Sequence, residues 1–147
     1  MAFEIREIDD TSGEFFAAVD AILDDAAAGL GLPFEPDKLH LRVDDAGGRL
    51  AGGLSGYFVQ GWLFVKLLAI VDEQRGSGIG RALMLRAEEI TRQKGYAGIY
   101  LDTFTFQAPR FYESLGYVEC GRLPAARGHA QRIWFAKAFD DAGGSRN

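Results

Sequence analysis

A glycine-rich stretch in the middle of the chain has the residue types of an anion-binding site. It encloses three glycines between two arginines and reads Arg75, Gly76, Ser77, Gly78, Ile79, Gly80 and Arg81. Glycines allow the backbone to approach a ligand closely with its N–H groups turned inward. Arginine side chains pair with phosphate oxygens through two parallel hydrogen bonds. The stretch therefore predicts a site for a phosphate-bearing ligand, and in particular for a diphosphate.

The segments on either side of the glycines indicate the strand and the helix that would hold them. Residues 62–71 are apolar, with β-branched and aromatic residues and one interior charge, Lys66, which is typical of a buried strand. After the glycines, apolar residues recur at the spacing of one helical face, at Ile79, Leu83, Ala87 and Ile90. A helix that begins at the turn would add the partial positive charge of its N-terminus to the site.

Three kinds of glycine-rich turn bind diphosphates, and their spacing distinguishes them. A P-loop has Lys followed by Ser or Thr after its glycines, and this chain lacks that pair. A dinucleotide fingerprint has GxGxxG in the first βαβ unit of a parallel sheet, whereas here GxGxG follows a predicted antiparallel hairpin. The third is the pyrophosphate loop of the GNAT superfamily of N-acetyltransferases, Gln/Arg-x-x-Gly-x-Gly/Ala. Arg75, Gly78 and Gly80 resemble this loop at every fixed position.

A second motif, downstream of the first, resembles the same superfamily. Residues 108–117 read Ala-Pro-Arg-Phe-Tyr-Glu-Ser-Leu-Gly-Tyr, which is similar to the closing helix and turn of those proteins. The resemblance covers roughly residues 50–139, and residues 101–109 and Gly128-His129 are similar to small bacterial members of unassigned substrate. It implies an α/β (α+β) fold with a mixed, twisted, mostly antiparallel sheet of about six to seven strands and about four helices.

The resemblance also implies acetyl-CoA as the co-substrate. The backbone N–H groups from Gly76 to Gly80 would bind its pyrophosphate. The backbone of Leu68, Ala69 and Ile70 would bind the pantetheine arm as an added strand. Gln107 lies near the position where many relatives have an Asn that bonds the pantetheine, and it would either replace that bond or cap the helix after it.

Acetyl transfer to an amine requires a proton for the thiolate that leaves and a neutral amine that attacks. The resemblance points to Tyr112 as the general acid, and a phenol does carry its proton at neutral pH. The alternative is that Tyr112 belongs only to the core. Relatives often have a Glu base where Phe64 stands here. Other relatives have an acid near the end of the following strand, and this resemblance makes Asp102 the candidate general base. A chain of water molecules is the alternative to Asp102.

Patterns elsewhere in the chain predict the remaining elements. Strands are expected over residues 3–8, 39–43, 50–59, 98–103, 117–122 and 129–139. One helix is expected over residues 13–28 with Ser12 or Thr11 as its N-cap, and another from about residue 108 to just before Gly116. We expect a single acetyltransferase domain over residues 1–139 and a flexible tail over residues 140–147.

Composition narrows the class of protein further. A formal net charge of −5 argues against a nucleic-acid partner. The N-terminal residues lack the apolar segment of a secretory signal, and no apolar run reaches the roughly 18 residues of a membrane span, so we expect a cytoplasmic protein without a membrane partner. The single cysteine, Cys120, is expected to be buried and inert. The only histidines, His40 and His129, have no ligand spacing, so no metal is expected.

Three readings of the function follow from these residues. The leading one is an acetyl-CoA-dependent N-acetyltransferase that acts on a primary amine of a small molecule or a protein. Transfer would occur by direct attack in a ternary complex, because no Cys is placed to form an acyl-enzyme. The alternatives are a non-catalytic acetyl-CoA-binding regulatory module and an acyltransferase that uses a different acyl-CoA. Homodimers are common in the superfamily, and the resemblance allows one here.

Overall fold

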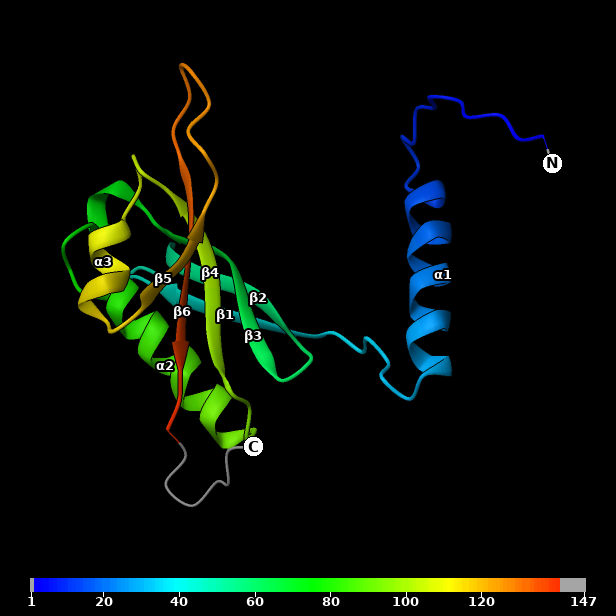
Figure 1. The fold of residues 1–147 in the computed structure, drawn as a ribbon. Helices are drawn as coiled ribbons and strands as arrows, with labels where there is room; N and C mark the ends of the chain where they lie inside the picture. The colour runs from blue at the N-terminus through cyan, green and yellow to red at the C-terminus, as the bar shows by residue number, and fades with distance from the viewer. Residues whose placement is uncertain (1, 141–147) are drawn as a thin grey trace. The chain divides into compact units, whose positions relative to one another are not determined.

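The computed structural model describes residues 2–140 and divides the chain into two compact units, residues up to 35 and residues from 36 on (Figure 1). The expected single domain over residues 1–139 stays a prediction. Of the expected tail, residues 141–147 lie outside the described part of the chain. None of the helices within residues 2–140 is both long and apolar enough to cross a bilayer.

The first unit contains one helix, α1 (Glu14–Gly29), close to the bounds predicted for it. Its start differs from the expectation, because Asp10 does most of the capping. The two carboxylate oxygens of Asp10 accept hydrogen bonds from the N–H groups of Phe15 at 2.9 Å and Phe16 at 2.8 Å. Ser12 accepts only one longer bond of 3.3 Å, and Thr11 provides no side-chain cap. A carboxylate there satisfies free helix N–H groups and also complements the helix dipole.

Residues 3–8 do not form the strand that their alternation predicted. They have no regular secondary structure. Alternation specifies a strand only where a neighbour supplies both a hydrogen-bond ladder and a surface for one face to cover. The prediction is wrong because the alternation carries no information about that neighbour.

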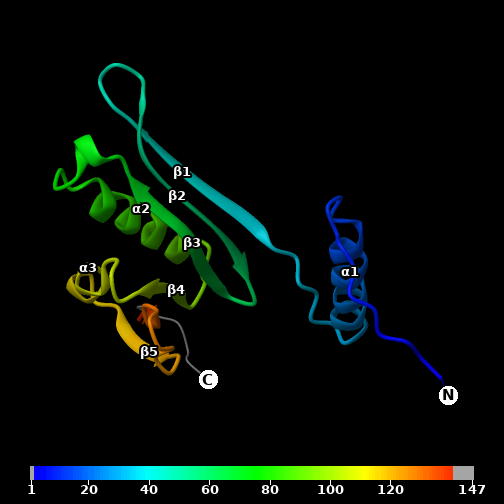
Figure 2. The same ribbon diagram turned by 90° about the horizontal axis from the view of Figure 1, so that it is seen from above.

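The second unit is built on a six-stranded mixed sheet with the strand order β1-β2-β3-β4-β6-β5 (Figures 1 and 2). The strands are β1 (Asp37–Asp44), β2 (Leu50–Val59), β3 (Trp62–Ile70), β4 (Gly98–Phe104), β5 (Val118–Arg122) and β6 (Arg132–Ala138). Every neighbouring pair is antiparallel except β3 and β4, which are parallel. The expected mixed and mostly antiparallel sheet is confirmed. Strand β6 starts three residues later than predicted, because the turn around Gly128 continues to His129, whose N–H donates to the carbonyl of Ala126 at 2.9 Å.

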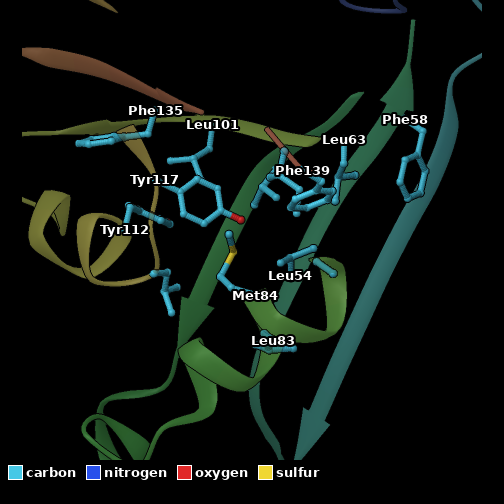
Figure 3. Packing of buried hydrophobic residues seen from close by; sticks show 14 of the residues in the cluster. Leu54, Phe58, Leu63, Leu83, Met84, Leu101, Tyr112, Tyr117, Phe135 and Phe139 are labelled. Atoms are coloured by element: carbon cyan, nitrogen blue, oxygen red, sulfur yellow. The ribbon is translucent and has the colours of Figure 1, made fainter. Parts of the chain in front are cut away.

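Two further helices, α2 (Ile79–Gln93) and α3 (Pro109–Ser114), lie on one side of this sheet in both views (Figures 1 and 2). A short 3₁₀ helix, η1 (Asp72–Gln74), precedes the glycine-rich turn. The described residues thus contain three α-helices rather than about four. The core between helices and sheet includes Leu63 of β3, Leu101 of β4, Met84 of α2 and Tyr112 of α3 (Figure 3). This packing fixes both helices against the two parallel strands.

Strands β3 and β4 stay together over only part of their length. Their pairing runs from Trp62 opposite Gly98 to Val65 opposite Leu101, and beyond Val65 strand β3 pairs with β2 alone. The register between β2 and β3 shifts at the same point, because Lys66 is an extra residue on β3. A bulge of this kind bends a strand and increases its twist. The two parallel strands therefore separate from Lys66 onward.

Cys120 is exposed, so the prediction that it is buried is wrong. It lies in β5, an edge strand of the sheet, where the register with β6 shifts between Glu119 and Gly121. The shift leaves Cys120 as the extra residue of a bulge, without a place in the alternation of the strand.

Candidate active site

A cleft of about 1050 Å³ opens where β3 and β4 separate. Its walls are the second half of β3, the glycine-rich turn with the start of α2, the end of β4, and α3. The site residues predicted from the sequence that line it are Leu68, Ala69, Ile70, Arg75, Gly76, Gly78, Ile79, Gly80, Arg81, Asp102, Gln107 and Tyr112. Ser77 does not line the cleft, and its hydroxyl donates to the carbonyl of Gln74. Residues from four separate segments of the chain thus meet in one cavity.

The glycine-rich turn presents the start of α2 to the cleft. Gly78 is the N-cap residue of α2 and has φ of 88°, and Gly76 has φ of 78°. Side chains disfavour this left-handed region, so glycine is required for the turn to close without strain. No side chain caps the helix at Gly78. An uncapped helix start offers N–H groups and a partial positive charge to an anion.

The charged side chains of the cleft are mostly cationic, although the chain as a whole carries a formal charge of −5. Lys66, Arg75 and Arg81 line the cleft, and Asp102 is the acid among its lining residues. Arg75 pairs with Asp72 at 3.1 Å, with both side chains largely exposed. Such an exposed pair contributes little to stability, so Arg75 can exchange Asp72 for an anionic ligand at small cost. The sequence indicated the two arginines, but the place of Lys66 in the wall follows from its bulge.

The second half of β3 offers a strand edge to the cleft. Between Lys66 and Ile70 this strand has β2 on one side and no partner strand on the other within the described sheet. Leu67 and Ala69 are exposed, and Leu68 and Ile70 are half-buried. An unpaired edge of this kind can take an extended ligand as an added strand.

Gln107 closes the turn that follows β4. Its side-chain oxygen accepts hydrogen bonds from the N–H of Phe104 at 3.0 Å and from the hydroxyl of Thr103 at 3.1 Å. Helix α3 has no side-chain cap, so the alternative in which Gln107 caps it is wrong. The bonds to the oxygen orient the amide NH₂ group, which is the donor that a ligand carbonyl in the cleft would need.

Tyr112 belongs both to the core and to the wall of the cleft. It is 9% exposed, and its ring packs against Tyr117 and Phe135 at centroid distances of 6.1 and 6.2 Å (Figure 3). Burial, together with the nearby negative charge of Asp102, raises the pKa of Tyr112 to about 12. Both causes favour the neutral phenol. Tyr112 therefore keeps its proton throughout the physiological pH range.

Asp102 forms an ion pair with a cation that no motif of the sequence indicated. Its Oδ1 accepts a hydrogen bond from Nε of Arg132 at 2.9 Å. The guanidinium of Arg132 also lies 4.9 Å from the ring centroid of Trp134. The register of β4 and β6 creates this pair, because Phe104 is opposite Arg132 and Asp102 is opposite Trp134. No local signal could have identified a partner thirty residues away in the sequence.

Within residues 2–140, no group of three His, Cys, Asp or Glu side chains is placed to hold a metal ion. His40 instead lies with its Nδ1 2.9 Å from the hydroxyl of Ser55.

Comparison with known proteins identifies the family. The sequence matches the model of the acetyltransferase (GNAT) family over residues 4–117. The chain belongs to the GNAT acetyltransferase family. This GNAT chain is 36% identical to an acetyltransferase of Agrobacterium fabrum over 107 residues, which are 71% of this chain and 78% of the relative. The family membership expected from the two motifs is confirmed.

Two further comparisons extend this result for the GNAT chain. It is 42% identical to blasticidin-S acetyltransferase of Streptomyces morookaense over 78 residues, which are 52% of this chain and 57% of the relative. The crystal structure of an acetyltransferase from Bacillus cereus has a TM-score of 0.78 and 26% identity, and the match covers 93% of this chain and 98% of that one. The expectations of an acyltransferase enzyme and of the GNAT fold are therefore confirmed.

Proposed function

We propose that the protein is an acetyl-CoA-dependent N-acetyltransferase that transfers an acetyl group to a primary amine. The observation that carries the proposal is that an open strand edge, an uncapped glycine-rich helix start and Tyr112 meet in one and the same cleft. Each part matches one section of acetyl-CoA. The strand edge matches the amide-rich pantetheine arm, the helix start matches the pyrophosphate, and Tyr112 matches the thioester.

The coenzyme would be held mainly by backbone groups. Residues 76–80 would donate N–H groups to the pyrophosphate at the start of α2, and Arg75 and Arg81 would pair with its oxygens. The edge of β3 at Leu68, Ala69 and Ile70 would bind the pantetheine amides, and Gln107 would donate to one of their carbonyls. The cationic lining of the cleft supports an anionic ligand of this kind.

In the reaction, the nitrogen of a neutral amine attacks the thioester carbon, and the C–N bond forms as the C–S bond breaks. The departing thiolate takes the proton of Tyr112, which is a neutral phenol at neutral pH, and Tyr112 then regains a proton from water. Its raised pKa of about 12 makes it a weaker acid than an ordinary tyrosine. The backbone of β3 around Leu68, Ala69 and Ile70 would also polarise the thioester carbonyl. The only cysteine of the sequence, Cys120, does not line the cleft, which supports direct transfer in a ternary complex.

The amine must also lose a proton, and the ion pair of Asp102 affects whether this carboxylate can accept that proton. Arg132 compensates the charge of Asp102 and holds the carboxylate in place. We therefore favour water as the acceptor of this proton and keep Asp102 as the alternative base.

The acceptor class is a primary amine of a small molecule or of a protein. The relative from Streptomyces morookaense is named for blasticidin-S, so this compound is a rational first acceptor to test. A homodimer and a cytoplasmic location stay predictions.

The test is calorimetry followed by a turnover assay. Acetyl-CoA, dephospho-CoA and NAD are titrated into the purified protein. Free thiol release from acetyl-CoA is then measured with blasticidin-S, lysine, polyamines and peptides with free N-termini. Binding of acetyl-CoA without a response to NAD, and amine-dependent thiol release, are the expected results.

Each other outcome points to a specific alternative. Failure of acetyl-CoA to bind would overturn the proposal. Tight binding without turnover of any amine would favour the non-catalytic module. Faster release from propionyl-CoA or succinyl-CoA would change the acyl group.

A further inference from the structure

A buried carboxylate is connected to the residues that follow α3, and the proposed reaction does not use it. Glu88 of α2 is 1% exposed. Its Oε2 accepts a hydrogen bond from the Tyr117 hydroxyl at 3.0 Å, and its Oε1 accepts one from Nζ of Lys137 at 2.9 Å. Nη1 of Arg92 lies 3.7 Å from the same Oε1. Burying a carboxylate is costly unless partners of this kind surround it, so the cluster depends on all its members.

The same cluster holds the chain just after α3. Nζ of Lys137 also donates a hydrogen bond to the carbonyl of Leu115 at 2.8 Å, and Leu115 is the C-cap residue of α3. The N–H of Tyr117 donates to the carbonyl of Tyr112 at 3.0 Å. Its ring lies beside that of Tyr112 (Figure 3). Glu88 is thus connected through Tyr117 to both the backbone and the ring of Tyr112.

Helix α3 needs such support because it is short. It has six residues, and no side chain caps its N-terminal end. A helix of this length has no stability of its own, so tertiary contacts must set its position. The connection from Glu88 joins the C-terminal end of α3 to α2, the helix whose start lines the cleft. The glycine-rich turn and Tyr112 are therefore linked through the protein interior.

We propose that Glu88, Tyr117 and Lys137 form a positioning triad that sets α3 so that the Tyr112 hydroxyl reaches the reacting sulfur. This inference rests on the proposed function, in which Tyr112 is the general acid. None of the three triad residues lines the cleft, so they are positioning residues and make no contact with the coenzyme. Displacing a reacting group by about 1 Å can cost roughly a hundredfold in rate, which makes a remote triad matter.

The first test uses Tyr117→Phe, which removes the hydroxyl bond to Glu88 and keeps the ring. We expect kcat to fall about tenfold or more while KM for acetyl-CoA stays within about twofold. In a Tyr112→Phe background the same substitution should cause no further loss of kcat, because the acid that it positions is already absent. Equal losses of kcat in both backgrounds would overturn the proposal and indicate a general structural role.

A matched control removes another buried hydroxyl, from α2, the helix that carries Glu88. Thr91 is buried on α2, and its Oγ1 donates to the carbonyl of Ala87 of the same helix at 2.7 Å. Thr91→Val should leave kcat and KM unchanged.

Lys137→Arg retains a cationic donor and should recover most of the kcat that Lys137→Met loses. Equal activity of Lys137→Met and the wild-type protein would count against the triad.

A readout that does not depend on turnover separates this inference from the proposed function. Amide hydrogen exchange of a peptide covering residues 109–117 should accelerate about tenfold in Tyr117→Phe and stay unchanged in Thr91→Val. If the wild-type protein acetylates no amine, the proposed function fails, and the exchange rates still decide whether the triad holds α3. Unchanged exchange in Tyr117→Phe would overturn the triad even in an active enzyme.

Discussion

At Tyr112, burial and the charge of Asp102 act in the same direction, since both disfavour the phenolate. If this proton goes to the coenzyme thiolate, Tyr112→Phe should lower kcat by about 10² to 10⁴, the usual contribution of a general acid. The affinity for acetyl-CoA should change by less than about threefold, because Phe preserves the ring and its packing. Steady-state kinetics and calorimetry on both proteins check this result. An unchanged kcat across pH would exclude Tyr112 as the acid.

The raised pKa of Tyr112 also predicts a loss of stability at alkaline pH. Tyrosine has an ordinary pKa of 10.0, and in the folded protein Tyr112 has a pKa of about 12, so above pH 10 the unfolded state releases this proton first. The contribution is complete below pH 10 and is lost as pH rises towards 12, amounting to about 1 kcal/mol by pH 11. Urea unfolding at pH 8 and pH 11 measures it. Tyr112→Phe should show the smaller loss, and identical losses in both proteins would contradict the assignment.

The Asp102 carboxylate predicts a separate change in the titration of Tyr112. Asp102→Asn removes the smaller of the two causes that raise the pKa of Tyr112, so this pKa should fall from about 12 and stay above 10 because burial persists. Alkaline absorbance titration, compared with Tyr112→Phe, isolates this one phenol.

If water accepts the amine proton, Asp102→Asn should also keep kcat within about tenfold of the wild-type value. A complete loss of the rising limb of the pH–rate profile would instead make Asp102 the base.

Among the elements, the glycine-rich turn carries the prediction for coenzyme binding. Gly78→Glu places a carboxylate at the uncapped start of α2 and also strains a residue with φ of 88°. We expect the Kd for acetyl-CoA to rise at least about a hundredfold, because like charges then face each other at a helix N-terminus. Gly128→Glu is the matched control, since Gly128 has φ of 79° and does not line the cleft. Equal affinity of the two variants would refute the site.

At the scale of the elements, local patterns predicted most strands and helices of the second unit, because periodicity reports which face of a segment is buried. The same patterns could not reveal the bulge at Lys66, since a run of apolar residues looks alike with or without an extra residue. They also failed at residues 3–8, where alternation occurs but no strand forms. The helix and the glycine turn were predictable, and the opening between β3 and β4 was not.

For the molecule as a whole, the net charge and the charge of the cleft have opposite signs. The chain carries a formal charge of −5, whereas Lys66, Arg75 and Arg81 line the cleft. The cationic groups that line the cleft should dominate the electrostatic potential within it. The Kd for acetyl-CoA should therefore rise several-fold between about 50 mM and about 500 mM NaCl, because salt screens these groups. Calorimetry at both salt concentrations measures this change. Arg75→Gln should weaken the salt dependence, and a salt-independent Kd would contradict a cationic site.

The sequence by itself determined the features that depend on neighbouring residues. These are the glycine turn with its flanking strand and helix, and the tyrosine three residues after the proline of α3. The family and the candidate coenzyme site were predictable from these local motifs. Tertiary structure decided how distant segments meet: the ion pair of Asp102 with Arg132, and the burial of Glu88 against Tyr117 and Lys137. Such pairs arise from strand register and helix packing, which bring together residues whose separation in the sequence carries no periodic signal.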